Sequence, residues 1–70
     1  MILTASEKEY IENNFIINEN TDLADLCDAL YFKTLETLDD RDYPTSMTFF
    51  IEKIMDKLSV AEISRWGELS

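Results

Sequence analysis

The chain has 70 residues and a formal net charge of −9 at pH 7, from fifteen acidic and six basic side chains. A chain of this length forms at most one domain and buries only about 60% of its unfolded surface, so its core has no room for a large cavity. Because contacts to phosphates need clustered Lys and Arg, the composition argues against direct binding of nucleic acid and against attachment to an anionic membrane surface.

The elements expected in this chain are helices. Hydrophobic residues make up 46% of the sequence, which is typical of a globular domain, and there are only one Gly and one Pro. Sheets with many turns need more of both residues than helices do. The sequence therefore predicts one all-α domain over residues 1–70, a small bundle of three helices plus a short fourth C-terminal helix. The expected helices cover about residues 6–17, 22–38, 46–58 and 60–66.

The first helix is predicted from its N-terminal cap. The segment TASEKE, residues 4–9, contains two overlapping capping boxes, in which a Thr or Ser is followed three residues later by Glu. Ile11 and Phe15 are four residues apart and form the inward face of a helix that ends near residue 17. A polar break at residues 18–21 then supplies N-cap candidates for the next helix.

The second helix, residues 22–38, has the clearest pattern of all. With an advance of about 100° per residue, its apolar side chains fall on one broad face and its acidic side chains on the opposite face. Acids in its first turns also suit the helix dipole. The apolar face consists of Leu23, Leu26, Cys27, Leu30, Tyr31, Leu35 and Leu38.

The third helix begins after a loop that ends at Pro44, and Thr45 and Ser46 are its N-cap candidates. Its apolar side chains again share one face, but Phe49 falls outside that face. The apolar face consists of Met47, Phe50, Ile51, Ile54, Met55 and Leu58.

The short fourth helix opens with a capping box at residues 59–62 and is expected to stop at Gly67, a residue typical of the C′ position. Trp66 is expected to hold this helix on the core, because a bundle of this size needs its large aromatic side chains inside. Tyr43, which precedes Pro44, is expected to pack over the end of the second helix.

Residues suited to catalysis or metal binding are scarce. The sequence has no His, the commonest general base and transition-metal ligand. Cys27 lies at a core position between Leu23 and Leu30, where an inert, buried thiol is expected. Residues 18–29 start like a calcium-binding loop, but Leu23 and Ala29 stand where that loop requires Gly and Glu. We therefore expect no enzyme activity, no bound metal and no cofactor.

The sequence predicts a cytoplasmic protein. A single cysteine cannot form an internal disulfide, which favours a reducing compartment. The first residues, Met-Ile-Leu-Thr, lack the basic and apolar regions of a signal peptide. No apolar stretch approaches the roughly 20 residues of a membrane span, so we expect no association with a membrane.

Acidic residues are concentrated in the first part of the chain and on one face of the second helix. Eleven of the fifteen acids but only three of the six bases lie within residues 1–42, which carry a net charge of −8. Phe32 falls inside this acidic face. An aromatic anchor surrounded by charge is typical of protein interfaces, and the acids would steer a basic partner toward it. We predict a partner-binding surface that consists of Asp22, Asp25, Asp28, Phe32, Glu36, Asp39 and Phe49.

The acidic face has two other interpretations. It could be an ordinary solvated surface, with Phe32 covered by Ile16, Ile17 or Trp66. Phe32 or Phe49 could instead mediate homodimerisation across a two-fold axis.

The opening of the sequence resembles that of many helix-turn-helix modules. The motif LTxxEKEYI starts a capped helix that precedes a Leu-rich helix. The resemblance implies a DNA-binding regulator. A recognition helix, however, needs basic and amide side chains aimed at base edges, and the second and third helices lack them. A degenerate helix-turn-helix regulator is therefore the least favoured interpretation.

Taken together, these features predict a non-enzymatic inhibitor or modulator that binds another protein. Its acidic helix, residues 22–39, is expected to dock on a basic partner, such as a nucleic-acid-binding protein whose positive groove it would occupy as a DNA mimic. Phages and mobile elements encode short single-domain proteins of this kind, so by analogy we expect a phage protein that acts in the host cytoplasm. A structural or regulatory homo-oligomer is the alternative.

Overall fold

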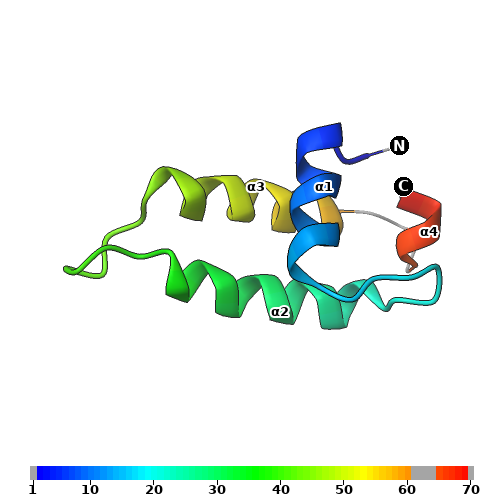
Figure 1. Ribbon diagram of the computed structural model, residues 1–70, viewed down its shortest axis with the longest axis horizontal. Coiled ribbons are helices and arrows are strands. Elements are labelled where there is room, and N and C mark those ends of the chain that lie inside the picture. Colours follow the sequence, from blue (N-terminus) through cyan, green and yellow to red (C-terminus); the bar gives the residue numbers. More distant parts are fainter. Residues whose placement is uncertain (1, 61–64, 70) are drawn as a thin grey trace.

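The computed structural model describes residues 2–60 and 65–69, and its elements are all helical (Figure 1). They are α1 (Ala5–Asn14), α2 (Leu23–Glu36), α3 (Ser46–Ser59) and α4 (Trp66–Leu69). The prediction of a small all-α bundle with three main helices and a short fourth is therefore confirmed. No helix in this part of the chain is long and apolar enough to cross a membrane.

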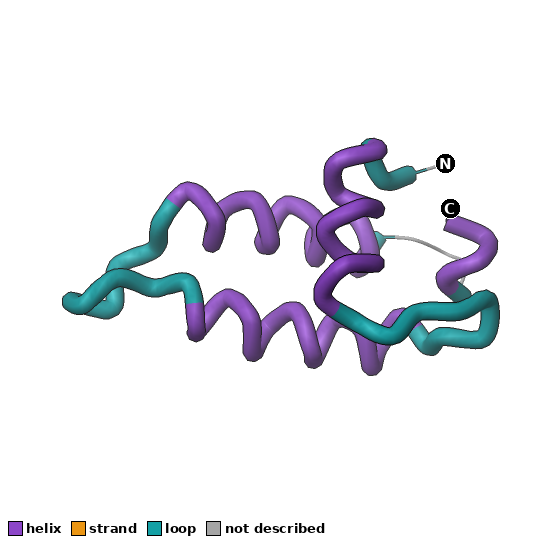
Figure 2. Tube along the Cα trace, in the orientation of Figure 1, coloured by secondary structure: helices purple, strands orange, loops and turns teal. Residues whose placement is uncertain are grey.

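α2 and α3 form an antiparallel hairpin, and α1 lies across it toward the end remote from the connecting loop (Figure 1 and Figure 2). Two contacts attach α1 to α3. The carboxylate of Glu7 accepts a hydrogen bond from Lys57 Nζ at 2.6 Å. The rings of Tyr10 and Phe50 meet edge to face, with centroids 5.6 Å apart. Because α1 crosses only part of the hairpin, the half near the connecting loop has no helix over it (Figure 2).

The core consists of apolar side chains from all four helices and the N-terminal segment. Trp66 is 4% exposed, which confirms its predicted place on the core. Its backbone N–H also donates to the carbonyl of Thr21 at 3.3 Å, and this bond ties α4 to the loop before α2. The buried apolar residues are Leu3, Ile11, Leu23, Leu26, Leu30, Ile51, Ile54, Leu58, Trp66 and Leu69.

The first helix begins as predicted but ends three residues early, at Asn14 instead of residue 17. Thr4 is its N-cap and forms a capping box with Glu7. Phe15 has extended backbone, with φ −137° and ψ 155°, so the chain leaves the helix while the Phe15 ring still packs on the core. The next side chain, Ile16, is 99% exposed.

α2 is shorter than predicted because Asp22 is its N-cap and Thr37 its C-cap. The predicted apolar face was too broad. Tyr31 and Leu35 are 54% and 48% exposed, whereas Thr34 is buried. Both side chains lie to one side of the buried stripe of α2, which consists of Leu23, Leu26, Leu30 and Thr34.

α3 matches its predicted range closely, and Thr45 is its N-cap. Its apolar face differs at the first turn, where Met47 is 46% exposed and Thr48 is buried. The polar side chain of Thr48 can be buried because its hydroxyl oxygen lies 2.6 Å from that of Thr37 at the end of α2. A buried hydroxyl with a partner avoids the cost of an unsatisfied polar group.

The predictions for residues 60–67 and for Tyr43 need correction. The fourth helix begins at Trp66, and residues 61–64 of the predicted helix lie outside the described part of the chain. Gly67 is inside α4 and has no positive φ, so it is not a C′ stop. A Cβ on Gly67 would lie 3.2 Å from the Glu19 Cα, which explains why a residue without a side chain fits there. The side chain of Tyr43 is 62% exposed, so it does not pack over the end of α2.

Candidate functional site

The outward face of α2 carries four of the predicted partner-binding residues. Its buried side chains point toward α3 and α1, and the side chains half a turn away point to solvent. The helix therefore brings the four together in one exposed strip, which we call the α2 outer face. It consists of Asp25, Asp28, Phe32 and Glu36, all of which are exposed.

Phe32 lies in the middle of the α2 outer face and is 64% exposed. The interpretation in which neighbours cover it is therefore wrong. Trp66 is enclosed in the core, and Ile16 is almost completely exposed. The Phe32 ring contacts that of Tyr31, whose centroid is 6.1 Å away at an interplanar angle of 64°.

The acidic side chains of the α2 outer face differ in their partners. Glu36 pairs with Lys33, whose Nζ lies 3.3 Å from the Glu36 carboxylate. Asp25 and Asp28 have no ion pair or side-chain hydrogen bond with any described residue. The uncompensated negative charge is therefore on the first turns of α2, on the N-terminal side of Phe32.

The other two predicted acids accept hydrogen bonds from backbone N–H groups, Asp22 at the start of α2 and Asp39 in the loop after it. Asp22 is the N-cap, and its carboxylate accepts from the backbone N–H of Ala24 at 2.9 Å. Asp39 accepts from the backbone N–H groups of Arg41 at 2.8 Å and Tyr43 at 3.0 Å. Both carboxylates remain exposed, so they add charge at the ends of the α2 outer face as well as shaping the chain.

Phe49 is 59% exposed but does not extend the α2 outer face. The buried residues of α3, such as Ile51 and Leu58, face the centre of the bundle, and Phe49 lies about half a turn away from them around the helix axis. Phe32 has the same relation to the buried residues of α2. The two rings therefore point outward from two different helices.

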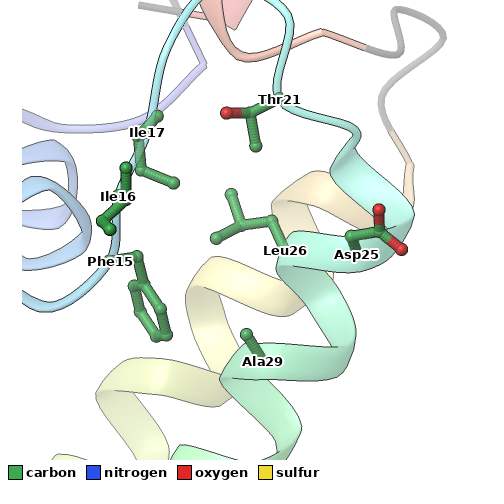
Figure 3. A pocket seen from close by; sticks show the side chains of 7 residues that line it. All are labelled: Phe15, Ile16, Ile17, Thr21, Asp25, Leu26 and Ala29. Atoms are coloured by element: carbon green, nitrogen blue, oxygen red, sulfur yellow. The ribbon is translucent and has the colours of Figure 1, made fainter.

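A groove beside the α2 outer face was not foreseen from the sequence. Residues 15–17 form one wall, and Thr21, Asp25, Leu26 and Ala29 form the other, around a volume of about 190 Å³. Ile17 and Leu26 face each other across it (Figure 3). The groove exists because α1 ends early and residues 15–17 run extended along α2, which the helical periodicity of the sequence did not indicate.

Cys27 is half-buried beside the core. Burial first, and the charge of Asp28 second, raise the pKa of its thiol above the ordinary value of 9.0. A thiol that stays protonated at neutral pH is a poor nucleophile, in agreement with the expectation of an inert cysteine. Within the described ranges, no three acidic or cysteine side chains come together as a metal site would require.

Comparison with protein-family models, with curated proteins and with solved structures found no match. The function must therefore be inferred from the geometry and charge of the surface. The α2 outer face and the groove beside it are the features used for that, and a second pocket of about 230 Å³ lies between Glu19 and the described C-terminal residues Arg65, Gly67 and Glu68.

Proposed function

We propose that this protein is a non-enzymatic protein-binding module, an inhibitor or modulator that docks the α2 outer face on a basic partner protein. The observation that carries the proposal is the 64% exposure of Phe32 among uncompensated acids. Full burial of a Phe side chain contributes about 1.5–3 kcal/mol, so a partner that covers this ring gains a substantial share of its affinity there.

The charge of the surface supports a basic partner. The chain carries −9 overall, and Asp25 and Asp28 have no cation beside them among the described residues. A positive partner would be attracted over several ångströms and would associate faster at low salt. A partner that binds nucleic acid has such a surface, and an inhibitor from a phage or mobile element would act by occupying it.

The degree to which α2 imitates DNA affects how binding responds to salt. The ion pair between Lys33 and Glu36 interrupts the row of negative charge, and Phe32 stands where a phosphate row would have another anion. These features favour an aromatic anchor with electrostatic steering over a close copy of the phosphate backbone. Affinity should then fall by a small factor between low and moderate salt, well short of the 10³–10⁵-fold loss that about six to ten phosphate-type contacts would cause.

The experiment that tests the proposal is partner capture with a matched variant. Wild-type protein and the triple variant Asp25→Lys/Asp28→Lys/Phe32→Ala are immobilised after circular dichroism has shown that both are folded. A bacterial lysate is passed over both at low and moderate salt, and retained proteins are identified by mass spectrometry. We expect a basic protein that the wild type retains and the variant does not.

Phe49→Ala is the control for this capture, because it removes an equally exposed ring from α3 and leaves α2 intact. It should retain the same protein as the wild type. If the wild type and the triple variant retain identical sets of proteins, the α2 outer face is ordinary solvated surface and the proposal fails.

A homo-oligomer is the second candidate function, and the exposed apolar side chains near the α2–α3 connecting loop favour it. Tyr31, Leu35 and Met47 are each about half exposed, at 54%, 48% and 46%. Against it, two copies that each carry −9 repel one another, most strongly where acidic faces meet. Light scattering at low protein concentration separates the two candidates: the docking module is a monomer, and a dimer of twice the 8.2 kDa mass would favour the oligomer.

The arrangement of helices gives no support to the helix-turn-helix interpretation. Such motifs join two helices at about 90–120° through a turn of three or four residues. Here α2 and α3 run antiparallel, and a connection of residues 15–22, which includes a turn at residues 18–21, separates α1 from α2 (Figure 1). DNA binding by the purified protein would revive that interpretation.

A further inference from the structure

We propose that the groove between residues 15–17 and α2 receives one apolar side chain of the basic partner, so that the partner is recognised as a basic amphipathic helix. This inference rests on the proposed function and adds the chemistry of what binds beside Phe32. Four observations support it: the size of the groove, its lining, its position on α2 and the charge at its edge.

The size and lining of the groove fit a single side chain. Its volume is about 190 Å³. A cavity of about 150 Å³ holds a benzene ring, whereas sites for cofactors and drug-sized ligands measure about 300–1,000 Å³. Ile17, Leu26 and Ala29 present carbon atoms to this space (Figure 3), so an aliphatic or phenyl group would replace water there favourably.

Ile16 shows that the groove is incomplete in the isolated chain. Residue 16 belongs to the segment that lines the groove, but its side chain is 99% exposed and lies on the side of that segment away from Leu26 (Figure 3). An isoleucine in this position contributes nothing to the core, and a partner helix that packs over residues 15–17 would cover it. Single exposed apolar residues are common, but this one belongs to a segment that lines an apolar groove, and the α2 wall of that groove includes Ala29, one turn before the exposed Phe32.

The position of the groove determines the spacing of the apolar side chains that a partner helix would need. Ala29 and Phe32 are three residues apart on α2, which corresponds to a rise of about 4.5 Å. A partner helix that lies along α2 would reach both points with apolar side chains three or four residues apart, the spacing of neighbours on one helix face. Helix-in-groove recognition uses anchors of this kind.

The charge at the edge of the groove selects a basic partner over a second copy of this chain. Asp25 belongs to the groove wall, and Asp28 lies one turn further along the α2 outer face. Lys or Arg residues that flank the partner's apolar anchor would pair with these carboxylates, whereas the corresponding surface of a second copy is acidic and would be repelled.

The test uses two fluorescent peptides and four single variants. One probe is a short amphipathic helix of Leu and Lys, and the other has every Leu replaced by Ala, which keeps its charge and helical propensity. Affinities are measured by fluorescence anisotropy at moderate salt. We expect the Leu/Lys peptide to bind the wild type at least about tenfold more tightly than the Ala/Lys peptide, since one well-buried anchor is worth about that factor.

The variants locate the binding. Ile16→Ala removes the exposed side chain beside the groove and Ala29→Leu fills the groove, and each should weaken binding of the Leu/Lys peptide by about five- to tenfold. Their matched controls, Val60→Ala and Ala24→Leu, make the same kind of change at exposed positions outside the groove and should leave the affinity unchanged. Neither groove variant removes core packing, so folding should be preserved in all four.

The possible results distinguish this inference from the proposed function. If both peptides bind equally, or if Ile16→Ala and Ala29→Leu bind like the wild type while Asp25→Lys/Asp28→Lys/Phe32→Ala loses binding, the groove takes no side chain and the docking function survives. If that triple variant binds the Leu/Lys peptide as tightly as the wild type, or the wild type binds neither peptide, the docking function itself is overturned.

Discussion

Lys57 Nζ lies 2.6 Å from Glu7 Oε1, and this contact joins α3 to α1. The Glu7 side chain is only 3% exposed, whereas Lys57 keeps 30% of its side chain in solvent. The same carboxylate accepts from the backbone N–H of Thr4 at 2.9 Å as part of the capping box. One buried acid therefore starts α1 and fixes it on the hairpin.

The first prediction concerns this ion pair. Lys57→Met should lower the free energy of unfolding by about 2–3 kcal/mol, because it leaves the buried carboxylate of Glu7 without its cation. Urea unfolding followed by circular dichroism measures the change. The control, Lys53→Met, alters an exposed residue of the same helix and should change stability by less than about 0.5 kcal/mol. Equal effects of the two substitutions would contradict a structural role for the pair.

The second prediction concerns acid stability. Burial alone would raise the pKa of Glu7, but the hydrogen bonds from Lys57 and Thr4 and the charge of Lys57 outweigh it, so the pKa lies below the ordinary 4.5. The resulting stabilisation is fully present above about pH 4.5 and is lost as the pH falls through the depressed folded-state pKa. Glu7→Gln has no carboxyl group to titrate there. Its unfolding free energy should thus decline less steeply than that of the wild type below pH 4.5. Parallel acid profiles would refute this assignment.

A third prediction concerns the hydroxyl groups that join the end of α2 to the start of α3. The hydroxyl of Thr45 donates to the carbonyl of Thr37 at 2.8 Å, and the buried Thr48 hydroxyl contacts that of Thr37 and accepts from the Thr45 backbone N–H. Thr48→Val keeps the shape but leaves the Thr45 backbone N–H without its acceptor and removes one partner of the Thr37 hydroxyl, so it should cost about 1–3 kcal/mol in chemical denaturation.

Ser46→Ala is the control for the threonine contact, because Ser46 is exposed in the same turn of α3. The double variant Thr37→Val/Thr48→Val should be less destabilised than the sum of its two single variants, since the hydroxyls act as one unit. Strict additivity would mean that the contact contributes nothing.

The fourth prediction separates binding from folding on α2. Phe32→Ala should change the free energy of unfolding by less than about 0.5 kcal/mol, because the ring is mostly in solvent. Leu30→Ala, two residues earlier and fully buried, should cost about 2–5 kcal/mol. Thermal or urea unfolding of the two variants gives both values. A large loss for Phe32→Ala would mean that the ring belongs to the fold and not to a docking surface.

The fifth prediction concerns the thiol of Cys27. Because its pKa is raised, the thiolate fraction at neutral pH is smaller than that of a free cysteine, and reaction with a disulfide reagent should be slow. Asp28→Asn removes the smaller of the two causes and should speed the reaction. Rates measured against pH check both statements, and a Cys27 that reacts faster than glutathione at the same pH would be inconsistent with them.

The helices were predictable from local signals. Caps such as Thr4 and Thr45 and the spacing of Leu23, Leu26 and Leu30 depend on neighbours within a few residues, so the sequence specifies them directly. The side chains of the α2 outer face were predictable for the same reason, because residues three or four apart on one helix always share a face.

The sequence by itself thus determined the fold class, the three main helices and the acidic strip on α2. Only the tertiary structure decided which apolar side chains remain exposed, because that depends on how far α1 reaches along the hairpin. It therefore decided that Phe32 is open, that Leu35 is half exposed and that Glu7 is buried against Lys57. The groove between residues 15–17 and α2 was also visible only in the structure. Residues 15–17 are not helical, so the helical periodicity of the sequence could not place them beside α2.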